Sequence, residues 1–206
     1  MDIPRRIRRA VVSQFMKPRG LAGALAGWEM AARSSNRRRN VWAVDLLNIR
    51  PEDHVLEIGC GPGVALREIS RRATEGSVVG VDHSATMVRQ ATRRNRTTVR
   101  SGRTRVVLGS AEDLPTLGTS FDKVLAVNNM GMWASPKEAL EKLRGLMRPG
   151  GRIAIVSQPR CPGATSETTH ASGREIQEKL ALAGFTDFES HLLELKPPVV
   201  CVIGRA

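Results

Sequence analysis

From residue 54 onward, short apolar runs alternate along the chain with segments in which apolar residues recur every three or four positions. The first pattern is typical of β-strands and the second of amphipathic helices. Strands are predicted at 55–58, 77–81, 105–108, 121–127, 152–157, 185–193 and 199–203, and helices at 64–73, 85–96, 136–147 and 173–182. Such alternation indicates an α/β fold with a mainly parallel sheet covered by helices on both faces.

The first 50 residues do not follow this alternation. They look helical and are rich in arginine, and one helix is predicted at 39–47 with Asn36 as its N-cap. No low-complexity linker separates this segment from the strands. We interpret residues 1–50 as a basic helical arm that forms a lid, and residues 51–206 as a single globular unit.

The net charge of +12 narrows the range of partners. Eleven basic residues and three acids lie in the first 50 positions, so most of the excess belongs to the arm. Such a surface attracts RNA, anionic lipid or acidic small molecules, although a plain solvated basic face has the same composition. Both interpretations of the arm stay open at this point.

The composition excludes several classes of protein. A chain of 206 residues with 41% hydrophobic residues can form its own core, which excludes a disordered or collagen-like chain. Three scattered cysteines and no Cys/His cluster at zinc spacing argue against a disulfide scaffold and a metal site. No apolar run has signal-peptide or membrane-span length, so we expect a cytoplasmic protein. From the cysteine and histidine spacing we expect no metal.

The segment with most chemical content follows the first predicted strand and reads Glu57-Ile-Gly-Cys-Gly-Pro-Gly63. Glycines at alternate positions let a ligand approach the backbone, and the next helix points its free N–H groups at that ligand. Val64 and Leu66 stand where a dinucleotide fingerprint needs its third glycine, and no Lys-Ser/Thr pair follows, so NAD and a P-loop are disfavoured. Asp82 ends the second strand, where a carboxylate can accept both hydroxyls of a ribose. The two features together predict a nucleoside site.

These residues belong to a larger set of motifs. With Gly109-Ser-Ala-Glu-Asp-Leu-Pro115 and Leu146-Met-Arg-Pro-Gly-Gly-Arg-Ile153, the sequence resembles class I S-adenosylmethionine-dependent methyltransferases, in particular small-molecule enzymes of the type 11 kind. The resemblance covers about residues 40–206. It implies a three-layer, doubly wound sheet of seven strands in the order 3-2-1-4-5-7-6, with strand 7 antiparallel, and S-adenosylmethionine as cofactor.

The resemblance also implies roles for residues around the cofactor. The glycine loop would carry the methionine part, and Asp82 would hold the ribose. The family usually presents an aspartate and an alanine to adenine; this chain has Ser110 and Ala111, which leaves adenine recognition open between Ser110 and Glu112. The residues expected at the cofactor are Glu57, Gly59, Cys60, Gly61, Gly63, Asp82, His83, Met87, Ser110, Ala111, Glu112 and Asn128.

The acceptor site is expected near the end of the fourth strand, Val127-Asn-Asn-Met-Gly-Met-Trp133. This segment lacks the Asn/Asp-Pro-Pro-aromatic motif of enzymes that methylate nucleobase amino groups, which disfavours that reaction. Methyl transfer from a sulfonium needs alignment more than acid–base groups. The chain has no tyrosine, and His170, in the connection after the fifth strand, is the candidate base. The residues expected at the acceptor are Trp28, Asn129, Trp133, Arg160 and His170.

Three functions are compatible with these patterns. The first is methyl transfer to an O, S or N nucleophile of a small molecule. The second is methylation of RNA or of a membrane-associated acceptor docked by the basic arm. The third is a non-catalytic protein that binds S-adenosylmethionine. The oligomeric state is not encoded in these patterns.

Overall fold

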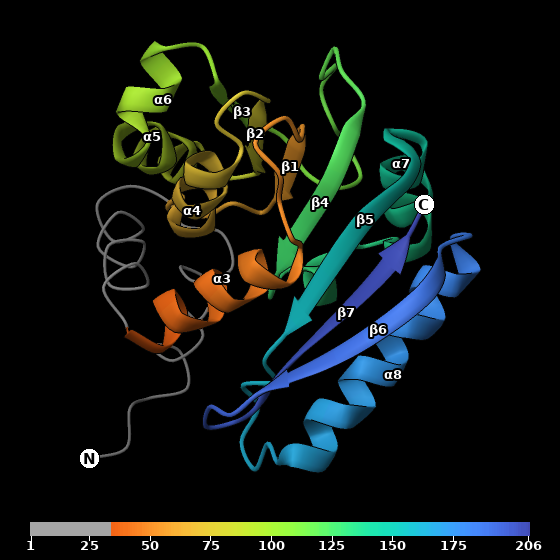
Figure 1. The fold of residues 1–206 in the computed structure, drawn as a ribbon. Coiled ribbons are helices and arrows are strands. Elements are labelled where there is room, and N and C mark those ends of the chain that lie inside the picture. The colour runs from red at the N-terminus through yellow and green to blue at the C-terminus, as the bar shows by residue number, and fades with distance from the viewer. Residues whose placement is uncertain (1–33) are drawn as a thin grey trace.

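The centre of the molecule is a sheet of seven strands in the order β3-β2-β1-β4-β5-β7-β6, in a computed structural model that describes residues 34–206 (Figure 1). Neighbouring strands from β3 to β5 pair in parallel, and β7 runs antiparallel to both β5 and β6. The predicted strand order and the antiparallel last strand are confirmed. The strands are β1 (Val55–Ile58), β2 (Val78–Asp82), β3 (Thr104–Leu108), β4 (Phe121–Val127), β5 (Met147–Ser157), β6 (Thr186–Leu193) and β7 (Val199–Arg205).

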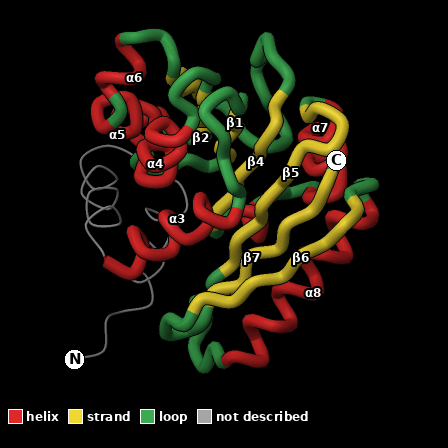
Figure 2. Tube along the Cα trace, viewed as in Figure 1, coloured by secondary structure: helices red, strands yellow, loops and turns green. Residues whose placement is uncertain are grey.

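Helices cover both faces of this sheet, which makes three layers (Figures 1 and 2). One core cluster joins the sheet to α3, α4 and α5, and a second joins its other face to α7 and α8. The helices are α3 (Ser34–Leu46), α4 (Val64–Arg72), α5 (Ala85–Arg94), α6 (Arg96–Arg100), α7 (Pro136–Gly145) and α8 (Ser166–Leu182), with a short 3-10 helix η1 (Met130–Met132). Within residues 34–206, no helix is long and apolar enough to cross a membrane.

The alternation of side chains along each strand explains the two clusters. Val124 and Ala126 belong to the cluster with α7 and α8, whereas Leu125 between them belongs to the cluster with α3 and α4. Successive side chains of a strand point to opposite faces, so a strand between two helical layers must be apolar on both sides. All four residues of β1 are buried, and Glu57 is the one ionisable residue among them.

Two predicted helix boundaries are wrong. Asn36 lies inside α3 and does not cap it, and α8 begins at Ser166, well before Gly173. Thr165 starts α8 with a capping box, in which its side chain accepts a hydrogen bond from the Thr168 main-chain N. Gly173 lies in mid-helix because α8 approaches the sheet there; a Cβ on it would come within 2.9 Å of Val200 Cγ2.

The boundary between α7 and β5 also differs from the prediction. The helix ends at Gly145, and β5 begins at Met147, not at residue 152. The early start follows from pairing on both sides, since Met147 pairs with Phe121 and the Gly151 carbonyl accepts the Ala206 main-chain N–H at 2.9 Å.

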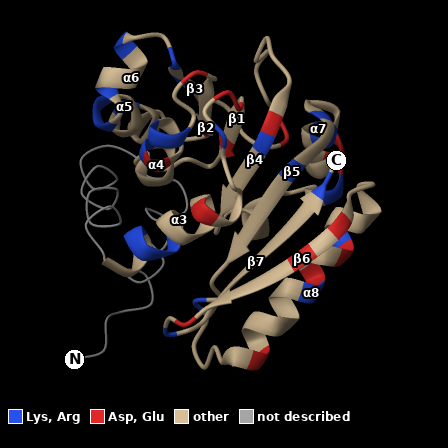
Figure 3. Ribbon diagram, viewed as in Figure 1, with Lys and Arg blue, Asp and Glu red and all other residues tan. Residues whose placement is uncertain are grey.

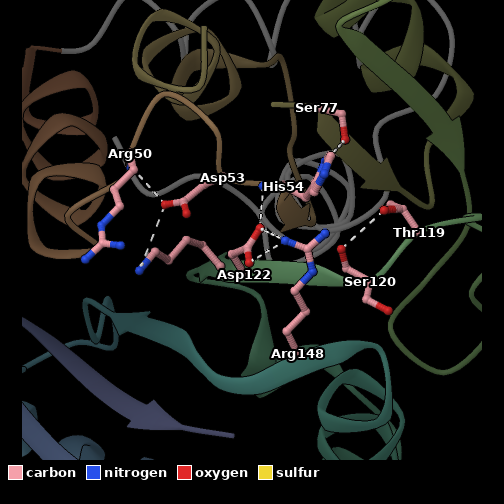
Figure 4. A network of polar contacts seen from close by, with 9 residues as sticks. Arg50, Asp53, His54, Ser77, Thr119, Ser120, Asp122 and Arg148 are labelled. Carbon is pink, nitrogen blue, oxygen red and sulfur yellow. Dashed lines mark hydrogen bonds and ion pairs between the residues drawn. The ribbon is translucent and has the colours of Figure 1, made fainter. Parts of the chain in front are cut away.

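A polar network ties together the amino-terminal ends of the central strands, opposite the edge where the glycine turn lies (Figure 4). Asp122 Oδ2 accepts the His54 main-chain N–H at 2.7 Å, and Arg148 Nη1 lies 2.8 Å from Asp122 Oδ1. His54 Nδ1 lies 2.7 Å from Ser77 Oγ, which links this end of β1 to the start of β2. His54 therefore has a structural position far from the carboxyl ends of the strands.

We expect Asp122→Ala to lower the free energy of unfolding by about 1–3 kcal/mol, because the substitution leaves the His54 amide without its acceptor. Thermal unfolding should register this as a loss of about 2–4 °C per kcal/mol. Asp113→Ala is the matched control, since the Asp113 carboxylate is exposed and makes no hydrogen bond to residues 34–206. Equal melting temperatures for the two variants would contradict the role of Asp122.

Candidate active site

A cleft of about 440 Å³ opens at the carboxyl ends of β1, β2 and β4. In this sheet β1 pairs with β2 on one side and with β4 on the other, so the cleft lies where the strand order reverses. Open α/β sheets bind their ligands at that point. The lining residues are Asn36, Arg39, Asn40, Glu57, Gly59, Cys60, Gly61, Pro62, Val64, Ala65, Asp82, His83, Met87, Val127, Asn128, Asn129, Met132 and Arg160.

The three glycines of the turn after β1 have different structural roles. All have positive φ, at 64° for Gly59, 51° for Gly61 and 77° for Gly63, a conformation that favours glycine. A Cβ on Gly59 would overlap the Asn129 amide, and one on Gly63 would lie 2.9 Å from Ala91 Cα. A Cβ on Gly61 would meet nothing within 4 Å. Gly61 is thus the glycine that leaves room for a ligand, whereas Gly63 packs against α5 and does not line the cleft.

Asp82 fixes the position of this turn. Its Oδ2 accepts the Gly61 main-chain N–H at 2.8 Å, and its Oδ1 accepts the Ser84 main-chain N–H at 2.9 Å. Each carboxylate oxygen keeps a second lone pair for a ligand hydroxyl. Burial raises the pKa of Asp82, and the two backbone hydrogen bonds partly oppose that rise. The predicted pairing of glycine turn and strand-end acid is therefore a direct hydrogen bond.

Glu57 lies beneath the turn as a buried and incompletely paired acid. Its side chain is 3% exposed, and its Oε2 has no hydrogen-bond partner among residues 34–206. Burial raises the pKa of Glu57 well above its ordinary value, the negative charge of Asp82 raises it further, and the Leu66 backbone partly opposes this. A positively charged ligand group would lower the pKa of Glu57 again, because a nearby positive charge favours the carboxylate form.

Cys60 is excluded as a nucleophile by the same surroundings. Burial, followed by the charges of Glu57 and Asp82, raises the pKa of its thiol well above the ordinary value. Thiol reactivity requires the thiolate, so this side chain stays inert near neutral pH.

Asn128 and Asn129 link the end of β4 to its two neighbours. Asn128 has a φ of 55°, and its Oδ1 accepts the Gln158 main-chain N–H at 2.7 Å. Asn129 Nδ2 donates to the Ile58 carbonyl at the end of β1. Both residues line the cleft, and their side chains hold three strand ends in register.

Helix α3, the described part of the basic arm, forms one wall of the cleft. Buried residues recur along α3 at helical spacing and so form one side of the helix. The apolar residues at the C-terminal end of that side belong to the core. The polar members at its start line the cleft. The buried or half-buried residues on this side are Asn36, Arg39, Asn40, Ala43 and Val44, followed by Leu47. Residues 1–33, with Trp28, lie outside the described residues, so the lid stays a prediction.

Arg39 is the most unusual residue in this wall. It is 5% exposed, its Nη1 donates to Gln158 Oε1 at 2.7 Å, and its Nη2 donates to Asn36 Oδ1. Burial, and secondarily the positive charge of Arg160, lowers the pKa of Arg39 to about 10, so the guanidinium stays charged at neutral pH. Sequence reasoning missed both Arg39 and Gln158. Arg39 belongs to a run of three arginines, which was interpreted as part of a basic surface.

The loop after β3 does not reach the cleft, although it was expected to recognise adenine. Ser110 Oγ accepts the Asp113 main-chain N–H, and Ala111 is buried in the core. Glu112 Oε1 accepts the Ala134 main-chain N–H at 2.8 Å. Neither Ser110 nor Glu112 therefore lines the cleft, and the role of either residue in adenine recognition stays a prediction.

Two residues expected at the acceptor also lie elsewhere. Trp133 is half-buried and packs against the core cluster with α7 and α8. His170 is exposed within α8, so its predicted place in a loop is wrong, and it does not line the cleft. Its catalytic role gains no support from this position. Asn129 and Arg160, by contrast, line the cleft as expected.

Comparison with known proteins identifies the class. Residues 55–151 match the family model of a methyltransferase domain. The chain is 32% identical to the uncharacterized methyltransferase YdaC of Bacillus subtilis (strain 168), over 88% of this chain and 97% of that protein. A trans-aconitate 2-methyltransferase of Rhodopseudomonas palustris is 33% identical over 65% of this chain and 49% of its own length. A SAM-dependent methyltransferase from Aquifex aeolicus has the same fold, with a TM-score of 0.72 and 18% identity over 88% of this chain and 97% of that one.

The chain therefore belongs to the methyltransferase family. It is a class I S-adenosylmethionine-dependent methyltransferase, so the predicted family, enzyme class and cofactor are confirmed.

We expect Glu57→Gln to raise the melting temperature at pH 8 and to have little effect near pH 5. A raised folded-state pKa means that Glu57 destabilises the fold as pH rises from its ordinary value of 4.5 through the folded-state pKa. Each unit of the rise corresponds to about 1.4 kcal/mol, or roughly 2–4 °C per kcal/mol in a chain of this size. Glu75→Gln, at an exposed turn, is the control. A variant less stable than the parent at pH 8 would contradict the burial argument.

We expect Gly61→Ala to weaken binding of S-adenosylhomocysteine, the demethylated cofactor, by about tenfold or more in calorimetry, because the added methyl group enters the cleft. The left-handed backbone adds a cost of about 1–2 kcal/mol to stability. Gly118→Ala is a matched control, since Gly118 has a φ of 72° and no atom within 4 Å of an added Cβ, but lies outside the cleft. Similar losses of stability with equal cofactor affinities would overturn this assignment of Gly61.

Proposed function

We propose that the chain transfers a methyl group from S-adenosylmethionine to an O, S or N nucleophile of a small molecule by direct displacement. The observation that carries the proposal is the joint position of Gly61 and Asp82, hydrogen-bonded to each other at the edge of a cleft. The space beside Gly61 and the incompletely paired Glu57 fit a ligand that carries positive charge.

In this proposal different residues of the cleft bind different parts of the cofactor. The turn at Gly61 and the carboxylate of Glu57 bind the methionine part, and Asp82 binds the ribose hydroxyls. His83 and Met87, which follow Asp82 along the chain, line the adjacent wall. The side chain of His83 is 36% exposed, with its Nδ1 4.0 Å from Asp82 Oδ1, so it lies at the rim.

The bound cofactor supplies a methyl group already activated by its sulfonium charge. The chain's own residues then bind the acceptor, align its nucleophile and exclude water. Helix α3 covers one side of the cleft, and the asparagines after β4 line its floor beside the turn. No covalent intermediate on Cys60 is needed, in agreement with the raised pKa of its thiol.

A small acceptor is favoured over a macromolecule by the wall that α3 forms. The polar residues at the start of the buried side of this helix line the cleft, whereas its exposed arginines, Arg37 and Arg38, lie on the outer side. A second basic cluster lies on α5 and α6 (Figure 3) and consists of Arg89, Arg93, Arg94, Arg96 and Arg100. These two helices contribute only Met87 to the cleft lining. The relative named trans-aconitate 2-methyltransferase also supports a small acceptor.

The test is calorimetry with S-adenosylmethionine and S-adenosylhomocysteine, followed by a screen of O, S and N acceptors for product release. Asp82→Ala should weaken both ligands by about 10- to 150-fold, the equivalent of the 1.5–3 kcal/mol of a hydrogen bond to a charged group. Glu75→Gln should leave both affinities unchanged, because Glu75 is exposed before β2 and does not line the cleft.

Unchanged binding by Asp82→Ala would overturn the cofactor site. Tight binding of both ligands with no methyl transfer to any acceptor class would overturn the catalytic proposal and favour a binding protein. Turnover of RNA alone, falling steeply with salt concentration, would overturn the choice of a small acceptor.

A further inference from the structure

Two arginine side chains meet on the side of the cleft formed by α3 and the end of β5. Arg39 Nη1 lies 2.7 Å from Gln158 Oε1, and Arg160 Nη2 lies 3.1 Å from the same oxygen. Both arginines line the cleft. One amide oxygen thus accepts hydrogen bonds from two guanidinium groups that approach from separate segments.

The orientation of Gln158 is fixed by its other contacts. Its Nε2 donates to the Pro197 carbonyl at 2.8 Å, and a carbonyl can only accept. The side-chain oxygen must therefore point toward the arginines. Its main-chain N–H donates to Asn128 Oδ1, and the residue is 6% exposed. Gln158 is a rigid support for both guanidinium groups.

Gln158 is electrically neutral, so it does not balance the positive charge of Arg39. Arg39 forms no ion pair with any carboxylate of residues 34–206, and its Nε is buried without a hydrogen-bond partner in that part of the chain. A buried charge without a counter-charge is costly, and a ligand anion would remove that cost. A carboxylate in place of the Gln158 amide would have given Arg39 a counter-charge.

We propose that the Arg39 and Arg160 guanidinium groups bind a carboxylate or phosphate group of the methyl acceptor. The inference rests on the proposed function and adds the chemical class of the acceptor, a small oxyanion. Guanidinium groups match the geometry of both carboxylate and phosphate oxygens. The methionine part of the cofactor carries one carboxylate beside an ammonium group, and its sulfonium adds positive charge, so the cofactor brings no net negative charge to the two arginines.

The experiment is calorimetry with two anionic probes, citrate and inorganic phosphate, and a neutral one, triethyl citrate. Each is titrated at constant ionic strength into the protein saturated with S-adenosylhomocysteine and into the cofactor-free protein. We expect citrate, phosphate or both to bind the saturated protein, and triethyl citrate not to bind.

Three variants test the residues. Arg160→Ala removes an exposed guanidinium, and Gln158→Glu adds a counter-charge at nearly constant shape; each should weaken anion binding by about tenfold or more. Arg71→Ala removes an equal charge at the surface of α4, where Arg71 pairs with Glu68, and should change the affinity by less than about twofold. Melting temperatures establish that each variant is folded.

The inference is overturned if neither anion binds the saturated protein, or if Arg160→Ala and Gln158→Glu bind both anions as the parent does. It is also overturned if S-adenosylhomocysteine displaces the anion, since the arginines would then hold the carboxylate of the cofactor while the proposed function stands. If S-adenosylhomocysteine does not bind at all, the proposed function fails. The cofactor-free titration then decides the anion site by itself.

Discussion

The hydrogen bond from the Gly61 main-chain N–H to Asp82 Oδ2 joins two segments 21 residues apart, and the cleft is built around it. Parallel pairing of Ile58 with Val81 brings the ends of β1 and β2 to the same edge of the sheet. The positive φ of Gly61 then turns its N–H group toward the carboxylate. The turn and the acid hold each other in place within the protein itself, so a ligand meets a preformed surface and orders little on binding.

The charges around the cleft are separated in space. Acidic groups, Glu57 and Asp82, lie at the ends of β1 and β2, and Arg39 and Arg160 lie beside β5. Between them β4 contributes neutral asparagines. Electrostatic interactions are strong in a buried environment of low dielectric constant. The acidic end of the cleft therefore favours a cationic ligand group, and the basic end favours an anionic one. A cationic donor at one end and an anionic acceptor at the other match this arrangement.

The α/β layers and the approximate limits of most elements follow from periodicity, whereas the strand order follows from the family resemblance, and the structure confirms both. The start of α8 was missed because Gly173 was interpreted as a boundary, whereas it is the point of close contact with Val200. Asn36 was taken for a cap because asparagine is common there, but its helix is α3, which begins before it. Local preference is weaker than packing in both cases.

The glycine turn, the acid at the end of β2 and the asparagines after β4 could be assigned from the sequence, because their positions depend on backbone conformation and on the ends of neighbouring strands. The place of Arg39 could not, since its partner Gln158 lies 119 residues away and an arginine run gives no sign of which member is buried. Alternation along the chain determines the fold class, and the glycine spacing determines the turn after β1, both through short-range physics. Only the packing of α3 across the sheet decided which arginine of the run lines the cleft, because burial depends on contacts between distant segments.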